Sequence, residues 1–316
     1  MAHVLFIKTS SLGDVIHHMP ALVDAAEACP DTAFSWVVEE TFAPLVRLHP
    51  AVGEVIPVAW RRWRKSLYRP VALKEIGSSL RALHSRRYDD VVDTQGLLRS
   101  ALIAAAARGR RHGYNAESIR EPLASLLYTV RHSVSRQLHA VERNRILSGL
   151  ALGYTPQGAP RFGLDREQLR SAGKHYAVLL HATAREEKLW AEANWVALGK
   201  TLGAGIELVL PWGNERERER SERLAATLPA ARVPPAMTID GIARMIAGAE
   251  FVVGVDTGLL HLAAALGVPL VAIFAGSQPA LTGPVGSGLI SVLGSDGASP
   301  SSEAVLRAVE KIRLQI

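Results

Sequence analysis

The chain has 316 residues and a single cysteine, Cys29, with 48% hydrophobic and 21% charged residues. This length predicts two domains of about 150 residues each, and one cysteine excludes an internal disulfide and a cysteine-based metal cluster. The net charge of +6 lies in the first half, because residues 1–165 hold 21 Lys and Arg against 15 Asp and Glu. The excess favours a polyanionic partner (nucleic acid, an anionic membrane surface or a phosphorylated substrate) as much as it fits a solvated basic face.

Short apolar runs and helical patterns alternate along both halves of the chain. In the first half they predict parallel strands at residues 4–7, 34–38, 55–58 and around 91–92, with helices at 15–28 and 71–83. In the second half they predict strands at 176–180, 206–210, 251–255 and 270–274, with helices at 191–202, 215–228, 239–247, 259–266 and 303–312. The stretch 153–163 holds three Gly and two Pro, which predicts a linker.

This alternation predicts an α/β protein with two Rossmann-like, doubly wound domains, at residues 1–155 and 164–316. The C-terminal helix is a candidate for packing back on the first domain. Residues 4–7 are too short for the apolar region of a signal peptide, and no uncharged stretch is long enough for a bilayer span. We therefore expect a cytoplasmic protein.

Ligands of doubly wound domains bind beyond the carboxyl ends of the strands. The first such junction carries Asp14 and lacks both the G-x-G-x-x-G and the Walker spacing, which argues against a nicotinamide or P-loop site. Asp14 is either a helix cap or a general base facing the interdomain cleft. We expect Asp93 and Gln95 at the same edge, and Asp89 and Asp90, at the start of their strand, in solvent.

A basic cluster at residues 61–65 follows the third strand. Its four cations suit phosphate groups, and Trp63 between them can seat an apolar or sugar face. Nucleic acid is a weaker partner for this cluster, because aromatic residues make up only 6% of the chain and are not interleaved with the basic residues.

The second half offers groups suited to a diphosphate. Thr183 and Lys188 follow the strand at 176–180 and could donate from a hydroxyl and an ammonium group. Asp-Thr-Gly at 256–258 leads from a hydrophobic strand into an apolar helix, whose first N–H groups and partial positive charge attract phosphate. His261, one turn into that helix, has no His partner at the spacing of a zinc site.

In this order, the sequence resembles the heptosyltransferases of glycosyltransferase family 9, whose fold is the two-domain GT-B architecture. Some motifs are specific to the heptosyltransferase I branch, whereas the heptosyltransferase II branch usually carries Asp-Ser-Gly-Pro-Met-His in the last of them. The motifs that carry the resemblance are Lys-Thr-Ser-Ser-Leu-Gly-Asp at 8–14, Trp-Val-Val-Glu-Glu at 36–40, Arg-Arg-Trp-Arg-Lys at 61–65, Asp-Thr-Gln-Gly-Leu at 93–97, Arg-Glu-Pro-Leu-Ala-Ser-Leu at 120–126, His-Ala-Val-Glu-Arg at 139–143, Pro-Trp-Gly at 211–213 and Asp-Thr-Gly-Leu-Leu-His at 256–261.

The resemblance implies an inverting transfer of L-glycero-D-manno-heptose from ADP-heptose to the Kdo of Kdo2-lipid A. It implies a peripheral protein on the cytoplasmic face of the inner membrane, with no nucleic-acid partner, no cofactor and no essential metal. The implied catalytic residues are Asp14, as general base, and Lys188. The implied donor-binding residues are Thr183, Lys188, Glu217, Met237, Asp256, Thr257, Gly258 and His261. The implied acceptor-binding residues are Arg61, Arg62, Arg64, Lys65 and Arg120.

Ala184 departs from the family pattern, which commonly has a second Thr at this position. The departure removes one hydroxyl that could contact the donor, so it bears on donor affinity. Two other hypotheses stay open: a sibling transferase with another core acceptor, and a non-catalytic module that binds lipid A or nucleic acid. A GT-B epimerase is a fainter alternative. The cluster at 61–65 favours transfer to Kdo2-lipid A over the sibling transferase. The carboxylate at position 14 and the near-neutral second half argue against the module.

Overall fold

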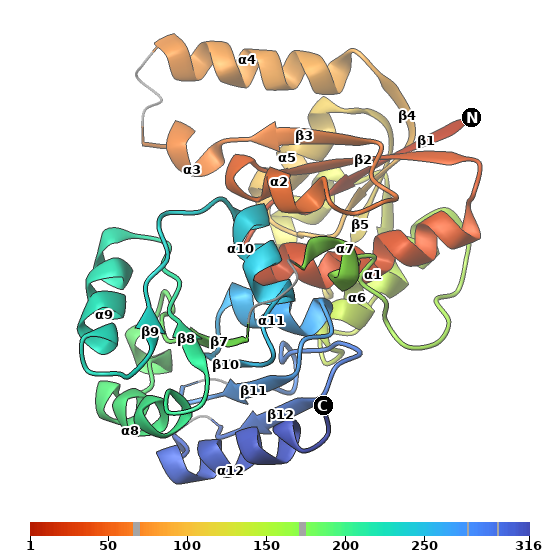
Figure 1. The fold of residues 1–316 in the computed structure, drawn as a ribbon. Coiled ribbons are helices and arrows are strands. Elements are labelled where there is room, and N and C mark those ends of the chain that lie inside the picture. Colours follow the sequence, from red (N-terminus) through yellow and green to blue (C-terminus); the bar gives the residue numbers. More distant parts are fainter. Residues whose placement is uncertain (66–69, 171–174, 277, 296) are drawn as a thin grey trace. The chain divides into compact units, whose positions relative to one another are not determined.

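The computed structural model describes residues 1–65, 70–170, 175–276, 278–295 and 297–316 (Figure 1). The chain forms two compact units, Met1–Gly163 (unit 1) and Leu164–Ile316 (unit 2). Among the described residues, no helix is both long and apolar enough to cross a membrane. Each unit is described by itself.

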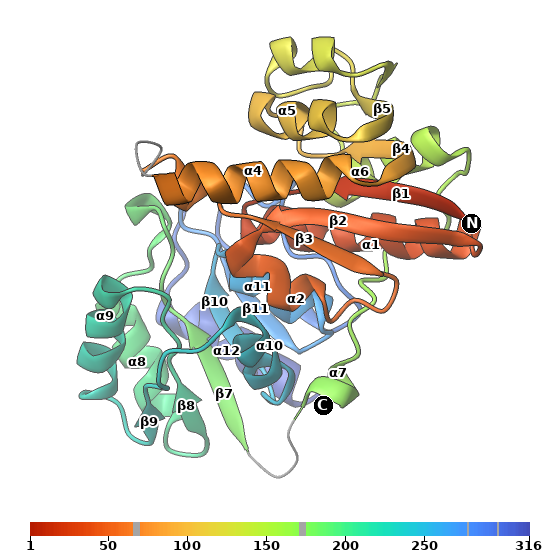
Figure 2. The ribbon, with the colours of Figure 1, turned by 90° about the horizontal axis from the view of Figure 1, so that it is seen from above.

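Unit 1 is a six-stranded parallel sheet with the strand order β3-β2-β1-β4-β5-β6. Helices α1 and α6 pack together on one face, and α4 and α5 lie on the other (Figures 1 and 2). The central strands are apolar because both of their faces are covered. The strands are β1 (Ala2–Ile7), β2 (Thr32–Glu39), β3 (Glu54–Val58), β4 (Arg87–Asp93), β5 (Arg108–Tyr114) and β6 (Val130–His132). The helical segments are α1 (Leu12–Ala28), η1 (Glu40–Phe42), α2 (Ala43–Val46), α3 (Trp60–Trp63), α4 (Pro70–His84), α5 (Leu98–Ala106), η2 (Pro122–Leu127) and α6 (Ala140–Leu152).

Unit 2 repeats this architecture with the order β12-β11-β10-β7-β8-β9. One core lies between the sheet and helices α8 and α12, where Trp190 and Trp195 meet edge to face at 4.9 Å. The last helix, α12, packs against α8 and β11 of its own unit. The strands are β7 (Tyr176–Leu180), β8 (Glu207–Val209), β9 (Ala231–Arg232), β10 (Val252–Val255), β11 (Leu270–Ile273) and β12 (Ile290–Leu293). The helical segments are α7 (Arg166–Leu169), η3 (Glu186–Lys188), α8 (Glu192–Leu202), α9 (Glu215–Ala225), α10 (Ile239–Ala247), α11 (Gly258–Ala265) and α12 (Ser302–Arg313).

The two parallel sheets confirm the predicted doubly wound α/β class, but the sequence missed four strands. These are β5, β6, β9 and β12, which lie toward the sheet edges. The first of them reads Arg-Gly-Arg-Arg-His-Gly-Tyr, so it lacks the apolar run that marks a buried strand. Predicted helix 215–228 ends earlier, at Ala225.

The predicted linker at 153–163 is held on unit 1. Arg145 of α6 is buried and forms a bidentate ion pair with Asp24 of α1, at 2.7 and 3.3 Å. The same guanidinium donates to the backbone carbonyls of Gln157 at 2.9 Å and Gly158 at 3.1 Å. Gly163 has a φ of +69°, and a Cβ there would lie 2.4 Å from a ring nitrogen of His49. This segment is therefore part of unit 1 rather than a loose tether.

Candidate functional site

Both sheets reverse strand order at equivalent points, which marks where each should bind a ligand. In unit 1 the reversal lies between β1 and β4, and in unit 2 between β7 and β10. Loops that leave the carboxyl ends of these neighbouring strands carry most of the residues singled out from the sequence. The side-chain contacts of each loop decide what it can do.

Asp14 lies in the first turn of α1, directly after β1. Its Oδ2 accepts hydrogen bonds from the backbone N–H of Ser11 at 2.8 Å and from the Ser11 hydroxyl at 3.1 Å, which closes a capping box. The helix-cap interpretation is therefore confirmed. In the described part of the chain no donor contacts Oδ1, so the cap occupies one carboxylate oxygen and is compatible with a second role for Asp14.

Gln95 fixes the loop that carries Asp14. Its side-chain oxygen accepts the backbone N–H groups of Thr9 at 3.0 Å and Ser10 at 3.2 Å, and Arg99 donates to the Ser10 hydroxyl at 3.0 Å. The sequence placed Gln95 at this edge but gave it no partner. The structure makes it a brace between β4 and the β1–α1 loop.

Asp93 is fully buried at the end of β4 rather than available to a ligand. It accepts the Tyr128 hydroxyl at 2.7 Å and the backbone N–H groups of Gln95 at 2.8 Å and Gly96 at 3.3 Å. Burial raises the pKa of Asp93. Its carboxylate therefore stabilises the turn at Gln95 and Gly96, which positions the Gln95 side chain.

Two buried ionisable groups at this edge were missed from the sequence, Lys8 and Glu39. The Lys8 ammonium donates to the Thr94 carbonyl at 2.8 Å. Burial lowers the pKa of Lys8, and the nearby carboxylates of Asp14 and Asp93 oppose that shift. Burial also raises the pKa of Glu39. The sequence feature that could have identified both residues is a charged residue at the carboxyl end of an apolar strand.

The basic cluster is partly committed to internal contacts. Arg62 forms a bidentate contact with Glu40, at 3.1 and 3.0 Å, and an ion pair with Glu75 of α4 at 2.7 Å. Trp63 is buried and its indole N–H donates to Glu75 at 2.8 Å. The prediction that Trp63 seats a sugar face is therefore wrong, because its ring joins α3 to α4. The role of Arg62 towards an acceptor stays a prediction.

Other cations of the cluster lie in solvent. Arg61 is exposed and its guanidinium lies 5.5 Å from the centre of the Phe42 ring. Arg64 and Lys65 are exposed, and they form no ion pair with any described residue. Arg120, on the loop after β5, is also exposed. These four side chains can meet an anion without breaking an ion pair among the described residues.

In unit 2 the strand reversal brings three of the predicted donor residues together. The Lys188 ammonium lies 2.5 Å from Oδ2 of Asp256, and their side chains are only 19% and 10% exposed. The Thr183 hydroxyl donates to the backbone carbonyl of Asp256 at 2.9 Å. The loop after β7 is thus fastened to the loop after β10.

Helix α11 begins directly beyond Asp256. Its N-cap is Thr257, whose hydroxyl makes no capping hydrogen bond, and Gly258 is its first residue. His261 is buried one turn in, with Nε2 3.8 Å from Oδ1 of Asp256. The first N–H groups of a helix and its dipole favour an anion at this end. The site therefore combines an ammonium group with a helix N-terminus.

Glu217, in the first turn of α9, and Met237, on the loop before α10, follow at the same edge. The Glu217 carboxylate accepts the backbone N–H of Gly213 at 2.8 Å and the side-chain amide of Asn214 at 2.7 Å, which shapes the start of α9. Met237 is half-buried just before α10. The Trp212 indole donates to the Pro234 carbonyl at 2.8 Å and ties these loops together. Their contacts with a donor stay predictions.

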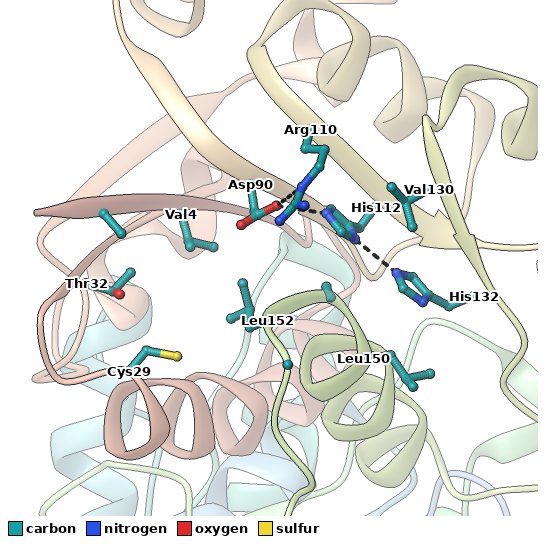
Figure 3. A pocket seen from close by; sticks show the side chains of 13 residues that line it. Val4, Cys29, Thr32, Asp90, Arg110, His112, Val130, His132, Leu150 and Leu152 are labelled. Atoms are coloured by element: carbon teal, nitrogen blue, oxygen red, sulfur yellow. Dashed lines mark hydrogen bonds and ion pairs between the residues drawn. The ribbon is translucent and has the colours of Figure 1, made fainter.

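A pocket of about 540 Å³ opens at the amino ends of the unit 1 strands, at the edge opposite Asp14 (Figure 3). There Asp90 accepts from Arg110 at 2.9 Å and lies 2.8 Å from His112 Nε2, and His112 Nδ1 lies 3.0 Å from His132 Nε2. The prediction that Asp90 is solvated is wrong, because side chains of the unforeseen β5 pair with it. Asp89 is exposed and accepts the backbone N–H of His3.

The described residues contain no group of three His, Cys, Asp or Glu side chains that could hold a metal ion. The pocket in Figure 3 has a carboxylate and two imidazoles, but its polar side chains pair with one another. Beside the Lys188–Asp256 pair of unit 2, the first N–H groups of α11 suit an anion.

Known proteins match this chain along most of its length. Residues 76–310 match the family model of glycosyltransferase family 9 (heptosyltransferase). Lipopolysaccharide heptosyltransferase 1 of Escherichia coli strain K12 is 46% identical over 290 residues, which cover 90% of this chain and 91% of that protein. The protein of the same name from Pseudomonas aeruginosa is 48% identical over 298 residues, with 93% and 84% covered.

Solved structures give the same result. The E. coli heptosyltransferase WaaC with ADP superimposes with a TM-score of 0.92 at 42% identity, covering 98% of this chain and 99% of that one. The same enzyme with ADP-2-deoxy-2-fluoro heptose gives a TM-score of 0.88 at 42% identity, with the same coverage. These likenesses confirm the predicted GT-B fold class.

Proposed function

Because the chain belongs to glycosyltransferase family 9, the heptosyltransferases, we propose that it moves L-glycero-D-manno-heptose from ADP-heptose to the Kdo of Kdo2-lipid A, with inversion, in lipopolysaccharide core synthesis. The observation that carries this proposal is the pairing of Lys188 with Asp256 at the N-terminus of α11. It lies where a Rossmann-like domain meets phosphate. Solved relatives that hold ADP and a fluorinated ADP-heptose share this fold.

In this proposal unit 1 supplies the base. A Kdo hydroxyl oxygen forms a bond to the anomeric carbon of heptose while the bond from that carbon to the ADP phosphate oxygen breaks. The hydroxyl proton passes to Asp14. The capping box uses only Oδ2 of this carboxylate, and no donor among the described residues contacts Oδ1, which can therefore accept the proton. The brace from Gln95 keeps the loop, and with it the carboxylate, in one position.

Unit 2 stabilises the departing ADP. Negative charge grows on the phosphate oxygens during transfer, and groups aimed at that charge lower the barrier. Lys188 and the first N–H groups of α11 are such groups, while Glu217 and Met237 face the nucleoside side. We propose that these groups replace a metal, so that a chelator leaves the rate unchanged.

Unit 1 also offers groups for the acceptor. Exposed cations on one unit suit the phosphates and carboxylates of Kdo2-lipid A, and a lipid-linked acceptor requires a peripheral protein at the cytoplasmic face of the inner membrane. The cations offered are Arg61, Arg64, Lys65 and Arg120.

One reaction tests the proposal. The purified protein is incubated with ADP-heptose and Kdo2-lipid A, with and without EDTA, and the lipid is analysed by mass spectrometry. We expect a product heavier by one heptose in both samples. Transfer only to an acceptor that already carries heptose would identify a sibling transferase. Acceptor binding without ADP release would identify a non-catalytic module.

A further inference from the structure

Unit 1 exposes four leucines on two neighbouring helical segments. Leu98 and Leu102 of α5 are 42% and 52% exposed, and Leu123 and Leu126 of η2 are 69% and 66% exposed. Single exposed leucines are ordinary on a protein surface, whereas a contiguous group marks an interaction surface. We call these four residues the leucine patch.

The four side chains belong to one surface. Helix α5 packs against η2, and the backbone N–H of Leu98 donates to the carboxylate of Glu121, one residue before η2, at 2.7 Å. Leu98 and Leu102 are four residues apart on an α-helix, so they share a face. Leu123 and Leu126 are three apart on a 3₁₀ helix, where such side chains eclipse. Figure 2 shows α5 beside β5 at one end of unit 1.

The inward faces of the same segments are small and buried. Ala101 and Ala104 of α5 and Ala124 of η2 are fully buried. At these two segments the apolar side chains that are buried in the core are alanines, and the four leucines lie outside the core. The folding of unit 1 gives no reason for leucine at these four positions.

The charge around the leucine patch is positive. Residues 98–127 contain five arginines and two glutamates. Arg120 is exposed just before η2, and Arg108 is exposed just after α5. Arg110 pairs with Asp90 at the opposite edge of the unit, so Arg108 and Arg120 are the exposed cations that adjoin the two segments. Apolar side chains with such cations next to them fit an anionic bilayer, where the leucines enter the acyl boundary and the arginines meet headgroup phosphates.

The leucine patch also lies next to the acceptor side of the site. A Cβ on Gly96 would lie 3.0 Å from Ile119, so the loop that ends in Arg120 packs on the turn that carries Gln95. Gln95 in turn holds the loop of Asp14. A bilayer on this surface would present its headgroups beside these residues.

We propose that the leucine patch docks unit 1 on an anionic lipid bilayer. The inference rests on the proposed function, because a lipid-linked acceptor reaches the enzyme from a bilayer. The leucine patch supplies apolar contact and the neighbouring arginines supply charge attraction. Docking orients the edge that carries Asp14 towards the lipid surface.

Vesicle binding tests the docking without relying on transfer. Full-length wild type, Leu123→Ser/Leu126→Ser and Leu98→Ser/Leu102→Ser are sedimented with vesicles of equal parts phosphatidylglycerol and phosphatidylcholine. The control is Leu150→Ser, which removes a leucine of α6 that is 50% exposed outside the patch. We expect each double variant to lose roughly tenfold or more in partition coefficient, and the control to bind as wild type does. Added salt should weaken wild-type binding.

Activity separates this inference from the proposed function. With an acceptor dispersed in detergent, the double variants should keep the wild-type kcat, since no residue of the leucine patch is placed in the reaction. Equal vesicle binding by wild type and both double variants would overturn the docking surface, whatever the transfer assay gives. Loss of a wild-type dimer in the variants, with vesicle binding unchanged, would assign the surface to a second copy of the chain.

Discussion

The ion pair between Lys188 and Asp256 permits a sharp test of the proposed donor site. Breaking a fully buried pair by removing one partner costs about 3–5 kcal/mol, because the other charge is left uncompensated. These side chains are 19% and 10% exposed, so water relieves part of that cost. We expect Lys188→Met to lower the free energy of unfolding of unit 2 by about 2 kcal/mol.

Removing both charges should restore part of the loss. The variant Lys188→Met/Asp256→Asn leaves no carboxylate that has lost its ammonium partner, and we expect a coupling energy of about 1–2 kcal/mol between the two positions. ADP binding should follow the same order. In Lys188→Met the Asp256 carboxylate repels the diphosphate, so the double variant should bind ADP more tightly than this single variant, although less tightly than wild type.

The assays are urea unfolding and calorimetric ADP binding, with Lys200→Met, an exposed lysine of α8, as a control of equal charge change. Additive unfolding energies, together with equal ADP affinity of the single and double variants, would show that the pair is not coupled. In transfer kinetics, Lys188→Met should lower kcat as well as raise the donor KM. A rise in KM alone would remove Lys188 from the catalytic assignment.

Three further predictions concern the base, the basic cluster and pH. Asp14→Asn, which keeps an acceptor for the cap, should lower kcat roughly 10²–10⁴-fold with ADP affinity unchanged, and near-normal turnover would leave Asp14 as a cap alone. Burial lowers the pKa of His49 to about 4, from the 6.5 of an exposed histidine. The stability that comes from burying His49 in its neutral form is therefore fully present above pH 6.5. As the pH falls from 6.5 towards 4, the unfolded chain takes up the proton first and stability falls by about 1.4 kcal/mol per pH unit; urea unfolding at intervals across this range measures it, and a flat profile in wild type, or the same slope in His49→Phe, would contradict it. Neutralising the exposed cations of the basic cluster should raise the acceptor KM, less so at high salt, with the donor KM unchanged, whereas equal acceptor KM values at every salt concentration would make the cluster a solvated face; the cations to change are Arg61, Arg64 and Lys65.

The sequence predicted the elements whose pattern is local. The central strands are apolar on both faces, and the structure has Asp14, Lys188 and Asp256 just beyond their carboxyl ends, as the sequence predicted; that these residues bind or react stays a prediction. Strand β5 was missed because its charges are neutralised by neighbours distant in sequence, as when Arg110 pairs with Asp90. No local pattern indicates such a pairing.

The side-chain partners at the site were not predictable for the same reason. Arg62 is one of four cations within residues 61–65, and the positions of η1 and α4 give it Glu40 and Glu75 as partners. Trp63, which the sequence alone left free for a ligand, is buried and donates to Glu75 of α4. Residue type and spacing thus located the groups, while tertiary packing decided which of them remain available.

The anchoring of residues 157–163 on unit 1 determines where relatives of this protein can be recombined. A chimera joined at residue 155 would take the buried Phe162 and the tightly packed Gly163 from a foreign parent. In such a chimera the two backbone carbonyls that accept from Arg145 would also come from the other parent. A crossover just after Gly163 keeps all these contacts within one parent, so the segment from Leu164 onward can be exchanged without disturbing the unit that carries Asp14.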